Sequence, residues 1–197
     1  MPQALNLERI TAPALEPLSL NEVKQQLRLE DQDGEDAALI AGLIRAARQQ
    51  AESYLGRALI TQSWSLWLDR WPTEGKAWVA LPRPPLQSVA FMKSYDEADA
   101  ATVVPAADYF VDSSGEPGRV VLRKGVAAPE ARRAAKGLEI RFNAGYGDDP
   151  HDVPEDIRAG LLLLIAHLYE NRGDRPSGAM SLSGAAQLWQ AHRVLRL

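Results

Sequence analysis

The stretch Pro154-Glu-Asp-Ile-Arg-Ala-Gly-Leu-Leu-Leu-Leu-Ile-Ala-His-Leu-Tyr-Glu-Asn-Arg-Gly173 decides the fold of this chain. Proline is tolerated at a first helical position, and the two acids after it place negative charge at the positive end of the helix dipole. Gly173 can adopt the positive φ that ends a helix. The stretch therefore predicts one helix over about 154–172, whose main apolar stripe consists of Ile157, Leu161, Leu164, Ile165 and Leu168.

Further apolar residues widen this stripe to nearly the whole circumference of the helix, namely Leu162, Leu163 and Ala166. Such a helix must be covered on several sides. A second long helix is predicted over about 35–55, because its apolar residues recur at intervals of three and four; they are Leu39, Ile40, Leu43, Ile44, Ala47, Ala51, Tyr54 and Leu55. We expect the two long helices to pack against each other.

Shorter helices and an N-terminal arm complete the helical part. Ser19 and Glu22 have the spacing of a capping box, which predicts a helix over about 19–29. Residues 30–34 lack the twelve-residue spacing of a calcium loop, so we interpret them as a turn between helices. The prolines of residues 1–17 favour an extended arm, and a C-terminal helix is expected over about 184–193, after a glycine-rich, flexible loop that begins at residue 173.

Between the long helices the apolar period changes from 3.6 to 2. Trp64, Leu66 and Leu68 alternate with polar residues, which is typical of a strand with one buried face. Strands are predicted at 63–70, 77–81, 88–94, 108–111, 119–123 and 138–144, and the proline-rich segment 81–86 is expected to run extended. The predicted class is α+β: a helical core of residues 18–58 plus 153–172, with residues 59–152 inserted as an antiparallel β module.

Composition restricts the possible functions. The chain has 197 residues, a net charge of −4 and no cysteine, which excludes disulfides and thiolate metal sites. Its longest apolar runs are far shorter than a membrane span, and it begins without a secretory signal pattern, so we expect synthesis in the cytoplasm. An acidic balance argues against tight binding to a nucleic-acid backbone.

Motifs of catalysis are missing, and two weak sites are kept as alternatives. The sequence has no phosphate-binding glycine loop, dinucleotide fingerprint, nucleophile elbow or His-Glu-x-x-His pair, and no cofactor is expected. A metal-dependent enzyme would use Asp148, Asp149, His151 and Asp152, although acids are favoured at a helix start in any case. A DNA-binding packaging factor would use Arg132, Arg133 and Lys136.

Four segments, in this order and spacing, resemble the head–tail connector (adaptor) proteins of long-tailed phages, a family that includes the adaptors of phage-derived gene transfer agents. They are Pro17-Leu-Ser-Leu-Asn-Glu-Val-Lys-Gln-Gln-Leu-Arg28, Ala51-Glu-Ser-Tyr-Leu-Gly-Arg-Ala-Leu-Ile-Thr-Gln-Ser-Trp64, Leu81-Pro-Arg-Pro-Pro-Leu-Gln-Ser-Val89, and Asn143-Ala-Gly-Tyr-Gly147 leading to Val153-Pro-Glu-Asp-Ile-Arg158 and Leu168-Tyr-Glu-Asn-Arg172. The resemblance runs from about Leu18 to the C-terminus, and residues 1–17 match nothing in it.

The resemblance implies a virion structural protein without enzymatic activity. Such a protein forms a ring, usually of twelve copies, under the portal of the filled head, and presents a platform for the next tail component, a stopper or tail terminator. DNA would pass through the channel of the ring without specific binding. Assembly at the head–tail junction of a phage or gene transfer agent particle would follow synthesis in the cytoplasm.

Two sets of residues are assigned to contacts in such a ring. A closed ring uses two different patches on each chain, and we expect neighbouring copies to meet at Arg45, Arg48, Glu52, Trp67 and Trp71. Four tryptophans within residues 64–78 are more than one small sheet face usually buries, which favours such a contact.

The apolar C-terminal segment has two interpretations. It can fold back on its own core, or it can form an arm that docks on the portal. The alternation of arginine with apolar residues and the resemblance favour the arm, with portal contacts from Leu188, Trp189, His192, Arg193, Val194, Leu195, Arg196 and Leu197.

Overall fold

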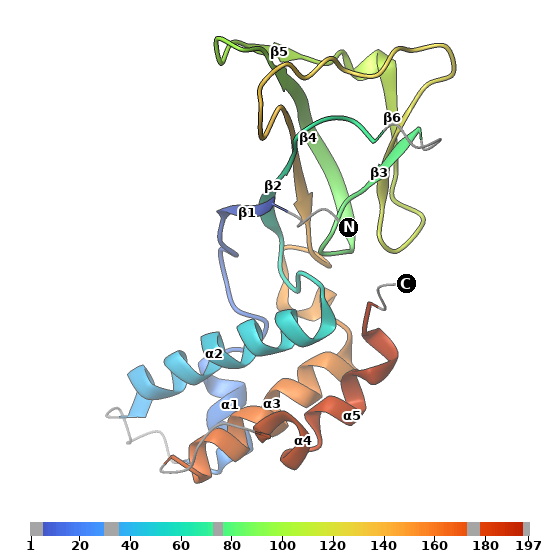
Figure 1. The fold of residues 1–197 in the computed structure, drawn as a ribbon. Helices are drawn as coiled ribbons and strands as arrows, with labels where there is room; N and C mark the ends of the chain where they lie inside the picture. Colours follow the sequence, from blue (N-terminus) through green and yellow to red (C-terminus); the bar gives the residue numbers. More distant parts are fainter. Residues whose placement is uncertain (1–5, 30–35, 73–76, 173–177, 195–197) are drawn as a thin grey trace. The chain divides into compact units, whose positions relative to one another are not determined.

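A computed structural model describes residues 6–29, 36–72, 77–172 and 178–194 (Figure 1). The chain forms two compact units. The first, here called the β unit, comprises residues 1–13 and 61–145; the second, called the helical unit, comprises residues 14–60 and 146–197. The fold class is α+β, as predicted.

The helical unit contains helices α1 (Leu20–Leu27), α2 (Ala37–Leu55), α3 (Glu155–Glu170), α4 (Ala179–Leu182) and α5 (Ala185–Trp189), with short 3-10 turns at Pro150–Asp152 and Gln190–His192. As predicted, α2 and α3 pack against each other; α5 and α4 lie along α3 on another side (Figure 1). Their buried apolar side chains form one core, whose largest members include Ile40, Leu55, Leu59, Ile157 and Trp189. The expected helix–helix turn at residues 30–34 lies outside the described residues.

The helix ends follow the predicted signals with two differences. The Ser19–Glu22 capping box is formed, and Gly56 ends α2 in the left-handed region at φ +72°. Pro154 occupies the N-cap, so α3 begins one residue later than expected. The helix also ends early, at Glu170, where Asn171 Nδ2 donates a 2.8 Å hydrogen bond to the carbonyl of His167; Gly173 lies outside the described residues.

As expected, α3 is covered on several sides, by α1, α2, α4 and α5. Its main stripe is buried at Ile157, Leu161, Leu164 and Ile165, but Leu163 remains 38% exposed. Coverage fails there because α1, α2, α4 and α5 leave one side of the helix open.

The β unit contains strands β1 (Asn6–Thr11), β2 (Gln62–Leu68), β3 (Trp78–Ala80), β4 (Leu86–Tyr95), β5 (Ala101–Val103), β6 (Tyr109–Asp112), β7 (Arg119–Leu122) and β8 (Leu138–Ala144). A 3-10 turn at Ala106–Asp108 precedes β6. One sheet has the order β1-β2-β8-β4-β5 and a second the order β3-β7-β6. All these strand pairs are antiparallel, as predicted.

Both edge strands of the larger sheet escaped sequence-based prediction. Within the expected N-terminal arm, residues 6–11 form β1, which pairs with β2 and is mostly exposed. Strand β5 is short and wholly exposed. Edge strands bury little apolar surface and therefore show weak alternation. The segment 81–86 is also less extended than expected, because Arg83 adopts φ +65° between two prolines.

Candidate functional site

The C-terminal segment folds back on the helical unit. The indole of Trp189 is fully buried, and its Nε1 donates a 3.0 Å hydrogen bond to the carbonyl of Ile157 on α3. The ring lies directly against Gly160, where an added Cβ would stand 2.2 Å from the indole Nε1. The preference for a free arm is therefore wrong for this residue, because a complementary surface on α3 exists within the same chain.

The neighbouring residues of the predicted portal-binding set are placed as follows. Leu188 and Arg193 are exposed, the guanidinium of Arg193 lying 5.1 Å from the ring centroid of Tyr54. His192 lies 3.6 Å from Asp156, and Val194 packs on Gly56 while its N–H donates to the carbonyl of Leu55 at 2.9 Å. Leu195, Arg196 and Leu197 lie outside the described residues. The portal-binding assignment can therefore use the exposed residues of this segment but not Trp189.

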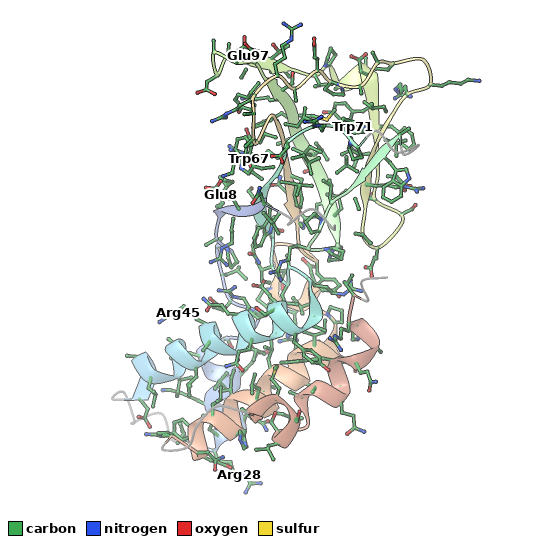
Figure 2. All side chains as sticks on the ribbon, in the orientation of Figure 1. Glu8, Arg28, Arg45, Trp67, Trp71 and Glu97 are labelled. Carbon is green, nitrogen blue, oxygen red and sulfur yellow. The ribbon has the colours of Figure 1, made fainter. Side chains whose placement is uncertain are left out.

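The predicted self-association residues of α2 point in different directions. Arg48 and Glu52 are buried, at 4% and 6% exposure, so the expectation that they meet solvent or another copy is wrong. Arg48 donates from Nε to Glu16 at 2.7 Å and from Nη1 to Glu52 at 3.0 Å. Glu52 in turn accepts the N–H of Leu59 at 3.1 Å. These two charges fasten α2 to other parts of its own unit, whereas Arg45 projects away from it (Figure 2).

The tryptophans of the β unit are mainly structural. Trp64 and Trp71 are buried, which corrects the assignment of Trp71 to a contact between copies. Trp67 is half-buried: its Nε1 donates to Glu8 on the neighbouring strand at 3.2 Å, and its ring centroid lies 5.8 Å from that of Tyr95 (Figure 2). The β unit contains two sheets, which together bury more indole surface than the one small sheet face on which the prediction was based.

The two alternative sites are explained by local contacts. Asp149 accepts the N–H of His151 at 2.8 Å, and Asp152 accepts the N–H of Asp149, so both acids cap a turn. The hydrogen bonds of Asp149 with the backbone and then with the side chain of His151 lower the pKa of Asp149. Within the described residues, no group of three or more His, Cys, Asp or Glu side chains is arranged to hold a metal ion.

The proposed DNA contacts are largely neutralised. Arg132 pairs with Glu130 at 2.9 Å, and Arg133 pairs with Asp99 at 3.0 Å. The ammonium of Lys136 lies 5.6 Å from the ring centroid of Trp67. The pairing of Arg132 and Arg133 with acids leaves less positive charge for a phosphate backbone.

Sequence reasoning missed a buried carboxylate in the β unit. Glu139, 3% exposed, accepts hydrogen bonds from Ser65 at 2.7 Å, Tyr95 at 2.8 Å and Arg141 at 2.8 Å. Burial opposes its ionisation, but the three donors outweigh that effect and hold its pKa below the ordinary 4.5. Only its hydrogen-bond donors on the neighbouring strands, Ser65 and Tyr95, reveal this group.

The Glu139 network predicts acid sensitivity of the β unit. Because the pKa is lower in the folded state, the network contributes its full stability above pH 4.5 and loses it as the pH falls through the folded pKa. Urea unfolding between pH 7 and pH 3, followed by tryptophan fluorescence, should show this loss. Glu139→Gln should lower stability at pH 7 and flatten the acid dependence; an unchanged slope would contradict the assignment.

No helix of the described residues is both long and apolar enough to cross a bilayer.

Comparison with known proteins gives a family and a set of solved structures. The family described as "Phage gp6-like head-tail connector protein" matches residues 17–90. No curated protein matches the chain.

Three similar solved chains come from gene transfer agent (GTA) particles. One, from the neck of an empty GTA particle computed with C6 symmetry, is 28% identical with a TM-score of 0.81, over 97% of this chain and 96% of that one. A chain from the virion of a native GTA particle is 26% identical with a TM-score of 0.77, over 98% and 97%. A third, from the neck of a native GTA particle computed with C12 symmetry, is 26% identical with a TM-score of 0.73, over 97% and 96%.

The family match covers the capping box, α1, α2, β2, β3 and the first half of β4, and the solved chains share the fold over at least 97% of this chain. Together they confirm the predicted resemblance of this chain to the head–tail connector proteins of phages and to chains from gene transfer agent particles.

Proposed function

We propose that this chain is a structural adaptor that forms a ring of twelve copies under the portal of a phage-like particle. The ring joins the DNA-filled head to the next tail component and surrounds the channel through which DNA passes. The observation that carries this proposal is the likeness, over 97% of the chain, to a chain in a neck computed with C12 symmetry. The function is structural rather than enzymatic, since the similar chains belong to particle necks and a virion.

The charge of the chain is consistent with a channel that lets DNA slide. Its net charge is −4, and the cations Arg132 and Arg133 are each paired with an acid. An acidic chain whose densest basic cluster is partly paired with acids releases few counterions from DNA and therefore does not retain it. The chain is made in the cytoplasm and joins the head–tail junction during assembly.

Portal docking is assigned to the C-terminal end. Leu188 and Arg193 are exposed there, beside the buried anchor Trp189. The segment can therefore offer an apolar and a basic side chain to an apolar groove with acidic rims while Trp189 keeps it attached to its own unit. The predicted contacts of residues 195–197 extend this surface beyond the described residues.

Removal of the last three residues tests the docking assignment. A chain without residues 195–197 keeps Trp189, so it should retain its helical circular dichroism signal and its melting temperature. In particles it should fail to join DNA-filled heads, and micrographs should show heads without tails. The matched control is the single change Gln25→Ala on exposed α1, which should leave assembly unchanged. Normal attachment by the truncated chain would contradict this docking site, and tailed particles in the complete absence of the chain would contradict the adaptor function itself.

A further inference from the structure

One accessible side of α2, next to Arg45, carries no charged residue over its whole length. It consists of Leu39, Gly42, Leu43, Ala46, Gln49, Gln50 and Ser53, all exposed or half-buried. They follow one another at helical spacings of three and four, so they share one side of the helix. In a chain with 24% charged residues, an accessible helix side of this length without charge is unusual. The cores of protein–protein interfaces are depleted of charge in the same way.

A groove adjoins this α2 face. It has a volume of about 530 Å³ and is lined by Ala46, Gln49, Gln50, Ser53 and Tyr54 of α2 and by Met180 of α4. Next along α4, Leu182 is 73% exposed. At Gly42 an added Cβ would meet no atom within 4 Å, so another chain can approach the helix backbone closely there. The α2 face is therefore shaped to receive uncharged side chains.

A second uncharged face lies on α3. Its accessible residues are Ala159, Leu162, Leu163 and Ala166, with Leu163 38% exposed. Because α2 and α3 pack through Ile40 and Ile44 on one helix and Ile157 and Leu164 on the other, the accessible sides of the two helices point away from each other. The helical unit thus has two different uncharged faces on opposite sides.

The charges beside these faces are complementary. Arg45 borders the α2 face, and Glu170 borders the α3 face; both are exposed. Among the described residues, neither side chain takes part in a hydrogen bond or an ion pair. A cation beside one face and an anion beside the other can pair when the two faces meet.

We propose that the α2 face of one copy packs against the α3 face of the next copy, with Arg45 facing Glu170 across the contact. This inference rests on the proposed ring. Two unlike patches on opposite sides form a heterologous contact, and repetition of that contact around an axis closes a ring. The occupant of the α2 face is therefore the α3 face of a second copy, and burial of Leu39, Leu163 and Leu182 contributes to the association.

Disulfide cross-linking in assembled particles tests this contact. The chain has no cysteine, so introduced pairs react without background. Ala46→Cys combined with Leu163→Cys should, on oxidation, give a ladder of multimers beyond the dimer. The pair cannot close within one chain because the two helices present these positions to opposite sides. The control pair Gln25→Cys with Leu163→Cys, which uses exposed α1, should give no ladder.

The outcomes separate the contact from the proposed function. A ring that is visible at the head–tail junction but gives no ladder overturns the assignment of the faces and leaves the adaptor function intact. If the single variant Ala46→Cys forms dimers on oxidation, the α2 faces of two copies meet each other, and the heterologous contact is overturned. Absence of the chain from the junction overturns the adaptor function. As a second measurement, Arg45→Glu should lower the cross-linking yield several-fold, and addition of Glu170→Arg should restore it; a yield that stays low overturns the pairing of these charges.

Discussion

Replacement of Trp189 by alanine is expected to destabilise the helical unit by about 3–5 kcal/mol, the range observed when a buried large aromatic side chain is removed from a core. The indole is fully buried, and its N–H satisfies the carbonyl of Ile157. Loss of the side chain leaves a cavity and removes one hydrogen bond to a carbonyl that lies within helix α3. Urea unfolding followed by circular dichroism at 222 nm measures the change.

Two further variants test the same contact from each side. Gly160→Ala places a Cβ 2.2 Å from the indole Nε1 and should displace the ring, although alanine favours helix. Leu188→Ala, one position away and 38% exposed, should change the unfolding free energy by no more than about 0.5 kcal/mol. Deletion of residues 185–197 should unfold the helical unit for the same reason as the Trp189 change. A truncated chain that remains folded would restore the interpretation of this segment as a free arm.

Replacement of Arg48 by methionine is expected to cost about 3 kcal/mol or more, the lower end of the range for breaking a buried ion pair. Arg48 and Glu52 are both buried, and Arg48 also pairs with Glu16. Methionine keeps most of the side-chain volume, so the loss reflects the charge and its hydrogen bonds. Thermal and urea unfolding of the single variant give the magnitude.

A matched control and a double variant isolate the ion pair. Arg45→Met, on the same helix and exposed, should stay within about 0.5 kcal/mol of the natural chain. Arg48→Met combined with Glu52→Gln should be more stable than Arg48→Met alone, because the glutamine keeps an acceptor for Leu59 without leaving a buried charge. Equal effects of Arg45→Met and Arg48→Met would contradict the buried network.

The sequence predicted those elements that bury one regular face. Helices α2 and α3 have long apolar periods, and Gly56 and the Ser19–Glu22 box marked helix ends correctly. Strands β2, β4 and β8, which have a partner on both sides in the larger sheet, were predicted. Strands β1 and β5 were missed, since a strand at the edge of a sheet has few buried neighbours to impose a pattern.

Side-chain roles were harder to predict than elements. Arg48 and Glu52 were predicted to lie on a polar helix face. Their burial depends on Glu16, which is distant in sequence and was therefore not recognised as a partner. Trp189 was predicted to be an exposed anchor. Its partner is the backbone at Gly160, which carries no side chain and therefore leaves no sign in the sequence pattern. The α2 face was not predicted, because it is marked only by the absence of charge, which no motif of reactive residues indicates.

The division of each unit between distant parts of the chain also has a consequence during protein synthesis. The helical unit needs residues 14–60 and 146–197, and its buried indole lies close to the C-terminus. At a synthesis rate of roughly 5–20 residues per second, α2 is made several seconds before α3 and Trp189, which cover it in the folded unit. A prematurely terminated chain lacks that cover and exposes its core to proteases. Folding of the helical unit therefore requires that both of its distant parts have been synthesised.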